Sequence, residues 1–237
     1  MNLGTTDINI VSDGTILMDG GSVFGQVPKS QWETQIKPDR RNRINKALNC
    51  MLVRTPKVNI LVDTGAGSKR QDKFKEAYGL NGNKLLKGLR ALGLTARDID
   101  IVVLSNLQFD HSGGCTKLDR SGNAVPTFPK AKYWMSKTDW EVCHQPEISD
   151  RFPNAPECVW PLDGLGLLEL MEGEQALTGQ LTTLPTPGHT PGHMSIVISS
   201  QGEKALILGD VLHNPVQAHE TDWVSRADMD PEQTRIT

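Results

Sequence analysis

The sequence predicts an α/β protein in which short buried strands alternate with helices and polar loops. Largely apolar runs at residues 58–62, 99–104 and 131–135 are bounded by turn-forming residues, as expected of buried strands. Segment 85–92 instead has leucines at helical spacing, and Gly93 follows it where a helix would end. This alternation favours a sheet with helices packed against it.

Further elements follow along the chain. Residues 95–98, Thr-Ala-Arg-Asp, have the pattern of a capping box, and residues 138–141 predict the start of a helix. Residues 181–184 read as a strand. Runs 194–198 and 204–208 flank a Ser-Gln-Gly-Glu turn and predict a β-hairpin.

Polar residues follow the predicted strands at the point where each strand ends. They are Asp63, Asp110, His111, His189 and Asp210. Rigid strands that end in polar loops at one edge of a sheet are a common way to build a functional site. We therefore expect these side chains to meet.

Composition excludes several classes of protein. The chain has 237 residues, 22% of them charged, and a net charge of −3, which does not predict a nucleic-acid-binding surface. No apolar stretch is long enough to cross a bilayer, and the first residues lack the pattern of a signal peptide. The cysteines are widely spaced and predict buried, reduced thiols: Cys50, Cys115, Cys143 and Cys158. A cytoplasmic location is expected.

Three loops carry residue types suited to binding a cation. Asp110 and His111 precede Ser-Gly-Gly, so a carboxylate and an imidazole share one tight loop. His189 and His193 lie in Pro-Gly-His-Thr-Pro-Gly-His, a stiff loop in which we expect one ligand and one structural histidine. Asp210 ends an apolar strand, and a buried carboxylate requires a cation or hydrogen-bond donors.

Together these segments resemble the metallo-β-lactamase superfamily. Its loop Thr-His-x-His-x-Asp-His-x-Gly-Gly is matched in part by residues 105–114, its later histidine by His189 and its bridging carboxylate by Asp210. Its Asp-Thr-Gly after a strand is matched by residues 63–65. The resemblance extends from about residue 49 to 210. It is greatest to the lactonase-like branch, with N-acyl-homoserine lactone lactonases and related esterase-like and phosphotriesterase-like hydrolases.

The resemblance implies a four-layer αββα sandwich, here a single domain over residues 1–237, with the site where loops of both sheets meet. It also implies a metal-dependent hydrolase of an ester, lactone or similar bond that acts through a metal-bound hydroxide on a small-molecule substrate. The implied metal ligands are Asp110, His111, His189 and Asp210, of which Asp110, His111 and Asp210 are also the implied catalytic residues. Asp63 and His193 are implied as residues that orient the ligands.

The sequence departs from the family pattern in two places. Asn106 and Gln108 occupy the positions of two loop histidines, and amide oxygens suit zinc less well than imidazoles do. We expect them to preserve the loop's shape and to weaken metal binding. The last strand and final histidine of the family do not follow residue 230, which predicts a sandwich without its C-terminal elements. One divalent ion at most is expected, zinc by resemblance, with manganese or iron as alternatives.

Other functions remain open from the sequence. A catalytically silent binding protein with the same fold, or an inactive fragment, is the main alternative, because two loop histidines are replaced. An aspartic protease would need a second Asp-Thr-Gly motif or a homodimer. A serine hydrolase would need a Gly-x-Ser-x-Gly motif, which is absent from the sequence. A cysteine hydrolase would need a cysteine that faces a histidine, and the sequence neighbours Cys143 and His144 do not predict this geometry.

Segment 24–32 resembles one that in lactonase-like proteins covers the pocket or pairs with a second chain, which is the basis for expecting a homodimer. Its apolar residues, together with Phe109 and Met135, either line a substrate pocket or belong to the ordinary core. For each of these residues, we expect a place in the ordinary core and not in a substrate pocket. The chemical identity of the substrate does not follow from the sequence.

Overall fold

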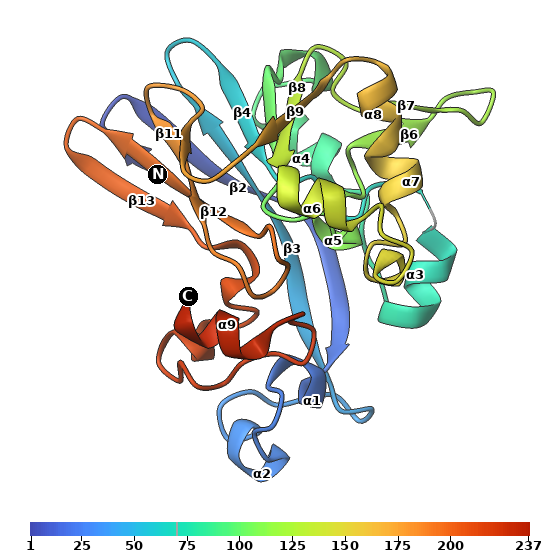
Figure 1. The fold of residues 1–237 in the computed structure, drawn as a ribbon, viewed down its shortest axis with the longest axis vertical. Helices are drawn as coiled ribbons and strands as arrows, with labels where there is room; N and C mark the ends of the chain where they lie inside the picture. Colours follow the sequence, from blue (N-terminus) through green and yellow to red (C-terminus); the bar gives the residue numbers. More distant parts are fainter. Residues whose placement is uncertain (70) are drawn as a thin grey trace.

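The computed structural model describes residues 1–69 and 71–237, and two of its β-sheets face each other (Figure 1). Within those residues the larger sheet has seven strands, in the order β1-β2-β3-β4-β5-β8-β9, and the smaller has four, β10-β11-β12-β13. Strands β6 and β7 form a separate ribbon.

The strands are β1 Asn2–Leu3, β2 Thr6–Asp19, β3 Arg43–Arg54, β4 Asn59–Val62, β5 Ile101–Val103, β6 Thr116–Leu118, β7 Ala124–Pro126, β8 Lys132–Ser136, β9 Leu168–Met171, β10 Gln175–Ala176, β11 Leu181–Pro185, β12 Met194–Ser200 and β13 Glu203–Ile207. The helices are α1 Gly20–Val23, α2 Lys29–Trp32, α3 Gln71–Tyr78, α4 Leu85–Ala91, α5 Phe109–Ser112, α6 Lys137–Val142, α7 Ala155–Cys158, α8 Trp160–Gly164 and α9 Pro231–Ile236. Short 3-10 helices are η1 Ala96–Asp98, η2 Ser149–Arg151, η3 Gly209–Val211 and η4 Pro215–Ala218.

The elements predicted from the apolar patterns are confirmed. Strands β4, β5 and β8 lie side by side in parallel, with Ile60 opposite Ile101 and Ile101 opposite Lys132. Strands β12 and β13 form the predicted antiparallel hairpin. The side chain of Thr95 accepts a hydrogen bond at the start of η1 and its backbone is capped by Asp98, which is the predicted capping box. Because parallel strands end at the same edge of a sheet, β4 and β5 deliver their following loops to one place.

Two apolar cores explain why these strands read as continuous apolar runs. Ile60 and Val62 belong to the core between the two sheets, together with Ile196 of the smaller sheet. Leu61 points to the opposite face and packs in the core under the helices with Leu89 of α4. Figure 1 shows helices α4, α5 and α6 on the side of the larger sheet that faces away from the smaller one. A strand buried on both faces does not alternate in polarity.

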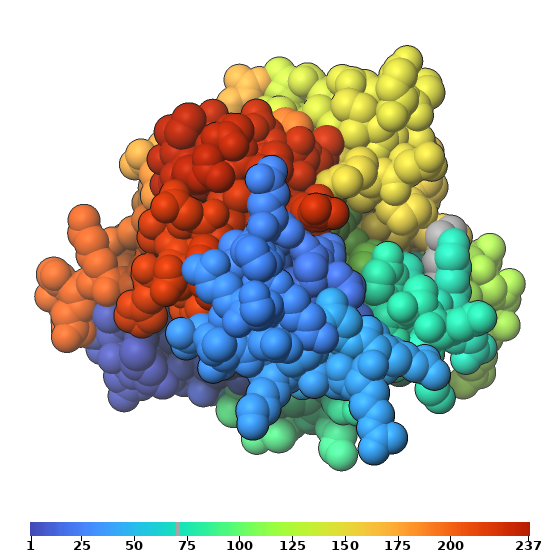
Figure 2. Space-filling view, turned by 90° about the horizontal axis from the view of Figure 1, so that it is seen from below, coloured from blue at the N-terminus to red at the C-terminus, as the bar shows by residue number. Residues whose placement is uncertain are grey.

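The segment at residues 20–36 packs against the C-terminal part of the chain. The rings of Phe24 and Trp223 meet edge-on with centroids 5.6 Å apart, and Ser225 Oγ donates a hydrogen bond to the carbonyl of Ser22. Figure 2 shows this blue segment beside the red C-terminal segment. Phe24 and Trp32 are buried there, and Met135 lies in the core under the helices. These residues are ordinary core, so the default expectation is confirmed for them.

The outer face of the smaller sheet is only partly covered. Leu184 and Val197 are half-buried and Leu206 is exposed. In the described residues, no helix is long and apolar enough to cross a membrane.

Candidate metal centre

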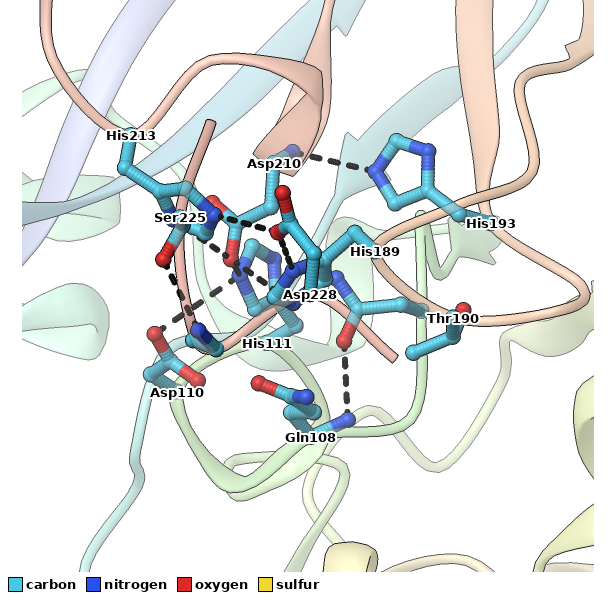
Figure 3. A network of polar contacts seen from close by, with 12 residues as sticks. Gln108, Asp110, His111, His189, Thr190, His193, Asp210, His213, Ser225 and Asp228 are labelled. Carbon is cyan, nitrogen blue, oxygen red and sulfur yellow. Dashed lines mark hydrogen bonds and ion pairs between the residues drawn. The ribbon is translucent and has the colours of Figure 1, made fainter. Parts of the chain in front are cut away.

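The loops that follow β4, β5, β11 and β13 bring their polar side chains together at one edge of the two sheets. Figure 3 shows Asp110, His111, His189 and Asp210 from the last three of these loops. Asp63 follows β4, Asp110 and His111 lie on α5 after β5, and Asp210 lies in η3 after β13. His189 comes from the loop between β11 and β12. All five are buried, and contacts of 2.9–3.7 Å link them through His111 and Asp210, so the structure brings together the residues expected to meet.

Close backbone approach holds the Asp110 loop in place. A Cβ atom on Gly114 would lie 2.2 Å from the carbonyl oxygen of Thr64, so only glycine allows the loop to approach the end of β4. Thr64 then anchors the loop, since its amide and its hydroxyl both donate to the carbonyl of His111, at 2.7 and 2.8 Å. The two glycines are therefore needed for the loop's position, since a Cβ atom on Gly113 would also lie 2.3 Å from the carbonyl oxygen of Ala66.

His111 lies between carboxylates on both sides. Its Nδ1 is 2.9 Å from Asp63 Oδ2, and its Nε2 is 3.0 Å from Asp210 Oδ2. Burial by itself lowers the pKa of His111, but Asp210, Asp63 and Asp110 outweigh it and raise the pKa well above its usual value. Without an added cation, His111 is therefore charged and donates from both nitrogens. Asp63 also accepts from the amide and hydroxyl of Ser105, which fixes the carboxylate that orients His111.

Lys46 of β3 contributes a second internal cation, which the sequence reasoning missed. Its Nζ lies 3.2 Å from Asp110 Oδ2 and 2.9 Å from Asp210 Oδ2. Burial lowers the pKa of Lys46, but the charges of Asp210 and Asp110 outweigh it and raise the pKa above its usual value. The pKa of Asp210 is held well below its usual range: burial raises it, but Lys46 and nearby imidazoles outweigh this effect. The positive charges of Lys46 and His111 therefore already balance the negative charges of Asp110 and Asp210.

His189 and His213 share one carboxylate on the other side of Asp210. Asp228 Oδ1 accepts from His189 Nδ1 at 2.9 Å and from His213 Nε2 at 3.0 Å. The opposite nitrogens face Asp210 Oδ2, with His189 Nε2 at 3.3 Å and His213 Nδ1 at 3.8 Å. In the sequence His213 is three residues after Asp210, and Asp228 carries no pattern that relates it to a histidine loop. Spacing and residue type therefore contain no signal that would pair His213 with Asp228.

His193 is a structural histidine. Its Nε2 accepts a hydrogen bond from the amide of Asp210 at 3.0 Å, while its Nδ1 is 3.1 Å from the carbonyl of Thr186. The imidazole thus holds the backbone of Asp210 and does not point its nitrogens at the carboxylate cluster. His189 faces the cluster.

The side-chain oxygen of Asn106 is used within its own loop. Asn106 Oδ1 accepts a hydrogen bond from the backbone amide of Gln108 at 2.8 Å, which turns the chain at the start of α5. The carbonyl of Gln108 then accepts from the amides of His111 and Ser112. The amide at position 106 therefore supports the loop's shape.

The donor atoms fit one divalent ion better than two. Beside His189 and Asp210, buried imidazole nitrogens have no hydrogen-bond partner, as a cation site requires. Between Asp110 and Asp210, the Lys46 ammonium contacts both carboxylates, and His111 donates to Asp210. A second metal ion between Asp110 and Asp210 would have to displace the Lys46 ammonium and deprotonate His111.

A cavity of about 730 Å³ opens beside these residues. It is lined by polar side chains that include Lys46, Asp110, His111, Asp210 and His213, and by apolar side chains that include Leu48, Met51, Leu212 and Pro215. This combination accommodates a small organic molecule with an apolar part and a polar group directed at the cluster.

Comparison with known proteins relates the chain to a group of hydrolases. Residues 46–235 match the family model described as the metallo-beta-lactamase superfamily. The chain is 31% identical over 127 residues to an N-acyl homoserine lactonase, AttM, of Rhizobium radiobacter, covering 51% of this chain and 43% of that protein. It is 25% identical over 201 residues to N-acyl homoserine lactonase AiiA of Bacillus thuringiensis subsp. kurstaki, covering 80% and 72%. The chain thus aligns with less than half the length of AttM.

Solved structures with the same fold cover the whole chain. A probable metal-dependent hydrolase from Staphylococcus aureus superposes with a TM-score of 0.86 and 30% identity, over all of this chain and 83% of that one. AidC, a dizinc quorum-quenching lactonase in complex with a product, N-hexnoyl-L-homoserine, superposes with a TM-score of 0.77 and 25% identity, over 100% and 82%. The predicted family and fold class are confirmed, and the chain belongs to the metallo-β-lactamase superfamily.

Proposed function

We propose that this protein is a metal-dependent hydrolase that cleaves an ester, lactone or similar bond of a small molecule, using one divalent ion. The observation that carries the proposal is that Asp110, His111 and Asp210 line a cavity of about 730 Å³, and that Asp210 also belongs to a donor group with His189 and His213. The names of AttM, AiiA and AidC support a lactone as the substrate class.

The ligands proposed from the sequence contribute unequally. His189 Nε2 has no hydrogen-bond partner and lies 3.3 Å from Asp210 Oδ2, whereas Lys46 contacts the carboxylates of both Asp110 and Asp210. When bound, a divalent ion such as zinc, or manganese or iron in its place, supplies a hydroxide at neutral pH and polarises the scissile carbonyl. Asp110 and His111 border the same cavity and can hold or move a proton beside the reacting bond.

Other side chains keep these groups in place. Asp63 orients His111, and His193 holds the backbone amide of Asp210. Lys46 supplies a fixed positive charge beside Asp210, where negative charge develops during acyl transfer.

The remaining proposals concern the protein as a whole. A homodimer, a single domain over residues 1–237 and a cytoplasmic location stay predictions. All four cysteines are free and buried, which favours a reducing compartment.

The alternative function is a metal-free binding protein that retains the pocket. The contacts of Lys46 with Asp110 and Asp210 favour it, because its ammonium already pairs with both carboxylates and offsets one of their two negative charges. The Asn106 side chain, hydrogen-bonded within its own loop, also favours it.

Hydrolysis assays separate the two functions. Purified protein would be incubated with N-acyl-homoserine lactones and with p-nitrophenyl esters, after loading with zinc, manganese or iron and after chelation. Turnover that chelation abolishes and that Asp210→Asn reduces at least 100-fold would support the hydrolase. Absence of turnover with every metal, together with saturable binding of a lactone, would support the binding protein.

A further inference from the structure

We propose that His213 is a metal ligand, and that His189, Asp210 and His213 form one three-donor site. This inference rests on the proposed single-ion function and deepens it. It replaces the ligands missing at positions 106 and 108 with a residue three positions after Asp210.

The first step is the convergence of three atoms. His189 Nε2, His213 Nδ1 and Asp210 Oδ2 all lie within 4.8 Å of one another. Both imidazoles have 1% of their side-chain surface exposed, and neither of these nitrogens has a hydrogen-bond partner. Buried polar atoms without hydrogen-bond partners are rare, because no interaction in the protein compensates the free-energy cost of removing them from water. Two such atoms facing one carboxylate oxygen point to a bound cation.

The second step is the tautomer of each imidazole. The shared acceptor is Asp228 Oδ1, which is buried and can only accept, so His189 Nδ1 and His213 Nε2 each donate to it. In the neutral rings the free nitrogens are then lone pairs directed at Asp210. A carboxylate behind a metal-bound imidazole is the usual arrangement that fixes its orientation, and here a single carboxylate does so for two (Figure 3).

The third step is the spacing. Two ligands of a tetrahedral zinc ion, each at about 2.0–2.1 Å, lie roughly 3.3 Å apart. His189 Nε2 and Asp210 Oδ2 are 3.3 Å apart, and His213 Nδ1 and Asp210 Oδ2 are 3.8 Å apart. The remaining pair, His189 Nε2 and His213 Nδ1, lies within 4.8 Å, so side-chain shifts of no more than about 1.5 Å bring all three donors to this spacing. Three protein ligands leave a fourth position for water, as in catalytic zinc sites.

The fourth step separates this site from Lys46. The ammonium contacts both oxygens of Asp210, Oδ1 at 3.0 Å and Oδ2 at 2.9 Å. Lys46 can therefore keep its hydrogen bond to Oδ1 of Asp210 when Oδ2 binds a metal ion. The three-donor site and the lysine can coexist, which the pair Asp110 and Asp210 does not allow.

The test is direct metal binding by the full chain, without substrate. Apoprotein would be titrated with Zn²⁺ by calorimetry and with Co²⁺ by visible absorption. We expect about one ion per chain and a tetrahedral Co²⁺ spectrum. His213→Gln should weaken Zn²⁺ binding at least tenfold and change the Co²⁺ spectrum. The matched control is His219→Gln, because His219 lines the same cavity but lies outside the three-donor cluster.

A second variant guards against misfolding of the first. Asp228→Asn retains every ligand atom but weakens the acceptor of both imidazoles, and it should lower Zn²⁺ affinity by roughly 10–100-fold. Zinc binding that is unchanged in both variants would overturn the role of His213 and leave the proposed hydrolase standing on other ligands. Absence of metal binding by the unaltered protein would overturn both.

Discussion

The ammonium of Lys46 lies 2.9 Å from Oδ2 of Asp210, the carboxylate that His111, His189 and His213 also approach. A strand residue thus places a permanent cation inside a cluster of potential metal ligands. Its side chain is 13% exposed, so water screens the pair only weakly. A cation that binds between Asp110 and Asp210 therefore competes with this lysine.

Lys46→Met should destabilise the metal-free protein by about 3–5 kcal/mol, because it leaves two buried carboxylates without their cation. Zinc should restore more stability to this variant than to the unaltered protein, since an ion can then occupy the lysine's place. Urea unfolding with and without zinc measures both effects, and Lys204→Met on an exposed strand position is the control. Equal stabilities of Lys46→Met and Lys204→Met would contradict the role assigned to the pair.

Asn106→His combined with Gln108→His should raise zinc affinity at least tenfold, because imidazoles are better zinc ligands than amides. The loop should lose about 1 kcal/mol of stability, since Asn106 no longer accepts from the Gln108 amide. Calorimetric titration measures the affinity. Asn106→Ala serves as the control, with the same loss of stability and no gain in affinity. An unchanged affinity in the double variant would mean that the loop no longer faces the ion.

His193 should make stability depend on pH. Burial, with the nearby His189, lowers the pKa of His193 to about 3, from 6.5. The folded state therefore binds fewer protons than the unfolded chain, so this contribution is complete above pH 6.5 and is lost as the pH falls towards 3. The slope should reach about 1.4 kcal/mol per pH unit. Urea unfolding at several pH values measures it, and His193→Gln should show a smaller slope. The same dependence of unfolding free energy on pH in the unaltered protein and in His193→Gln would refute the lowered pKa of His193.

Gly188→Ala should destabilise the protein by about 1–3 kcal/mol, because Gly188 has φ +138 and a Cβ atom would lie 2.5 Å from the amide of Thr234. Because the added Cβ atom would force the loop away from Thr234, the neighbouring His189 should move and zinc binding should weaken. Gly122→Ala is the matched control, with φ +84 and nothing within 4 Å of the added Cβ. Thermal unfolding and zinc titration of both variants test this. A larger loss in the control would show that backbone strain alone, and not the contact with α9, determines the effect.

Much of the fold could be predicted because local patterns encode it. The run at 58–62 became β4, the leucines of 85–92 became α4, and the Ser-Gln-Gly-Glu turn joined β12 to β13. Asp63, Asp110 and Asp210 could be placed near one another because they follow strands that end at one edge. Spacing and residue type were sufficient for these residues.

The contacts of Lys46, His213 and Asp228 could not be predicted in the same way. Lys46 is 164 residues from Asp210 in the chain and lies in the middle of a strand, where a lysine usually points to solvent. The sequence by itself determined the family, the fold class and the residues of the ligand loops, because these depend on local spacing. Only the tertiary structure decided which cation balances each carboxylate, because that balance depends on which distant side chains burial brings within about 3 Å of one another.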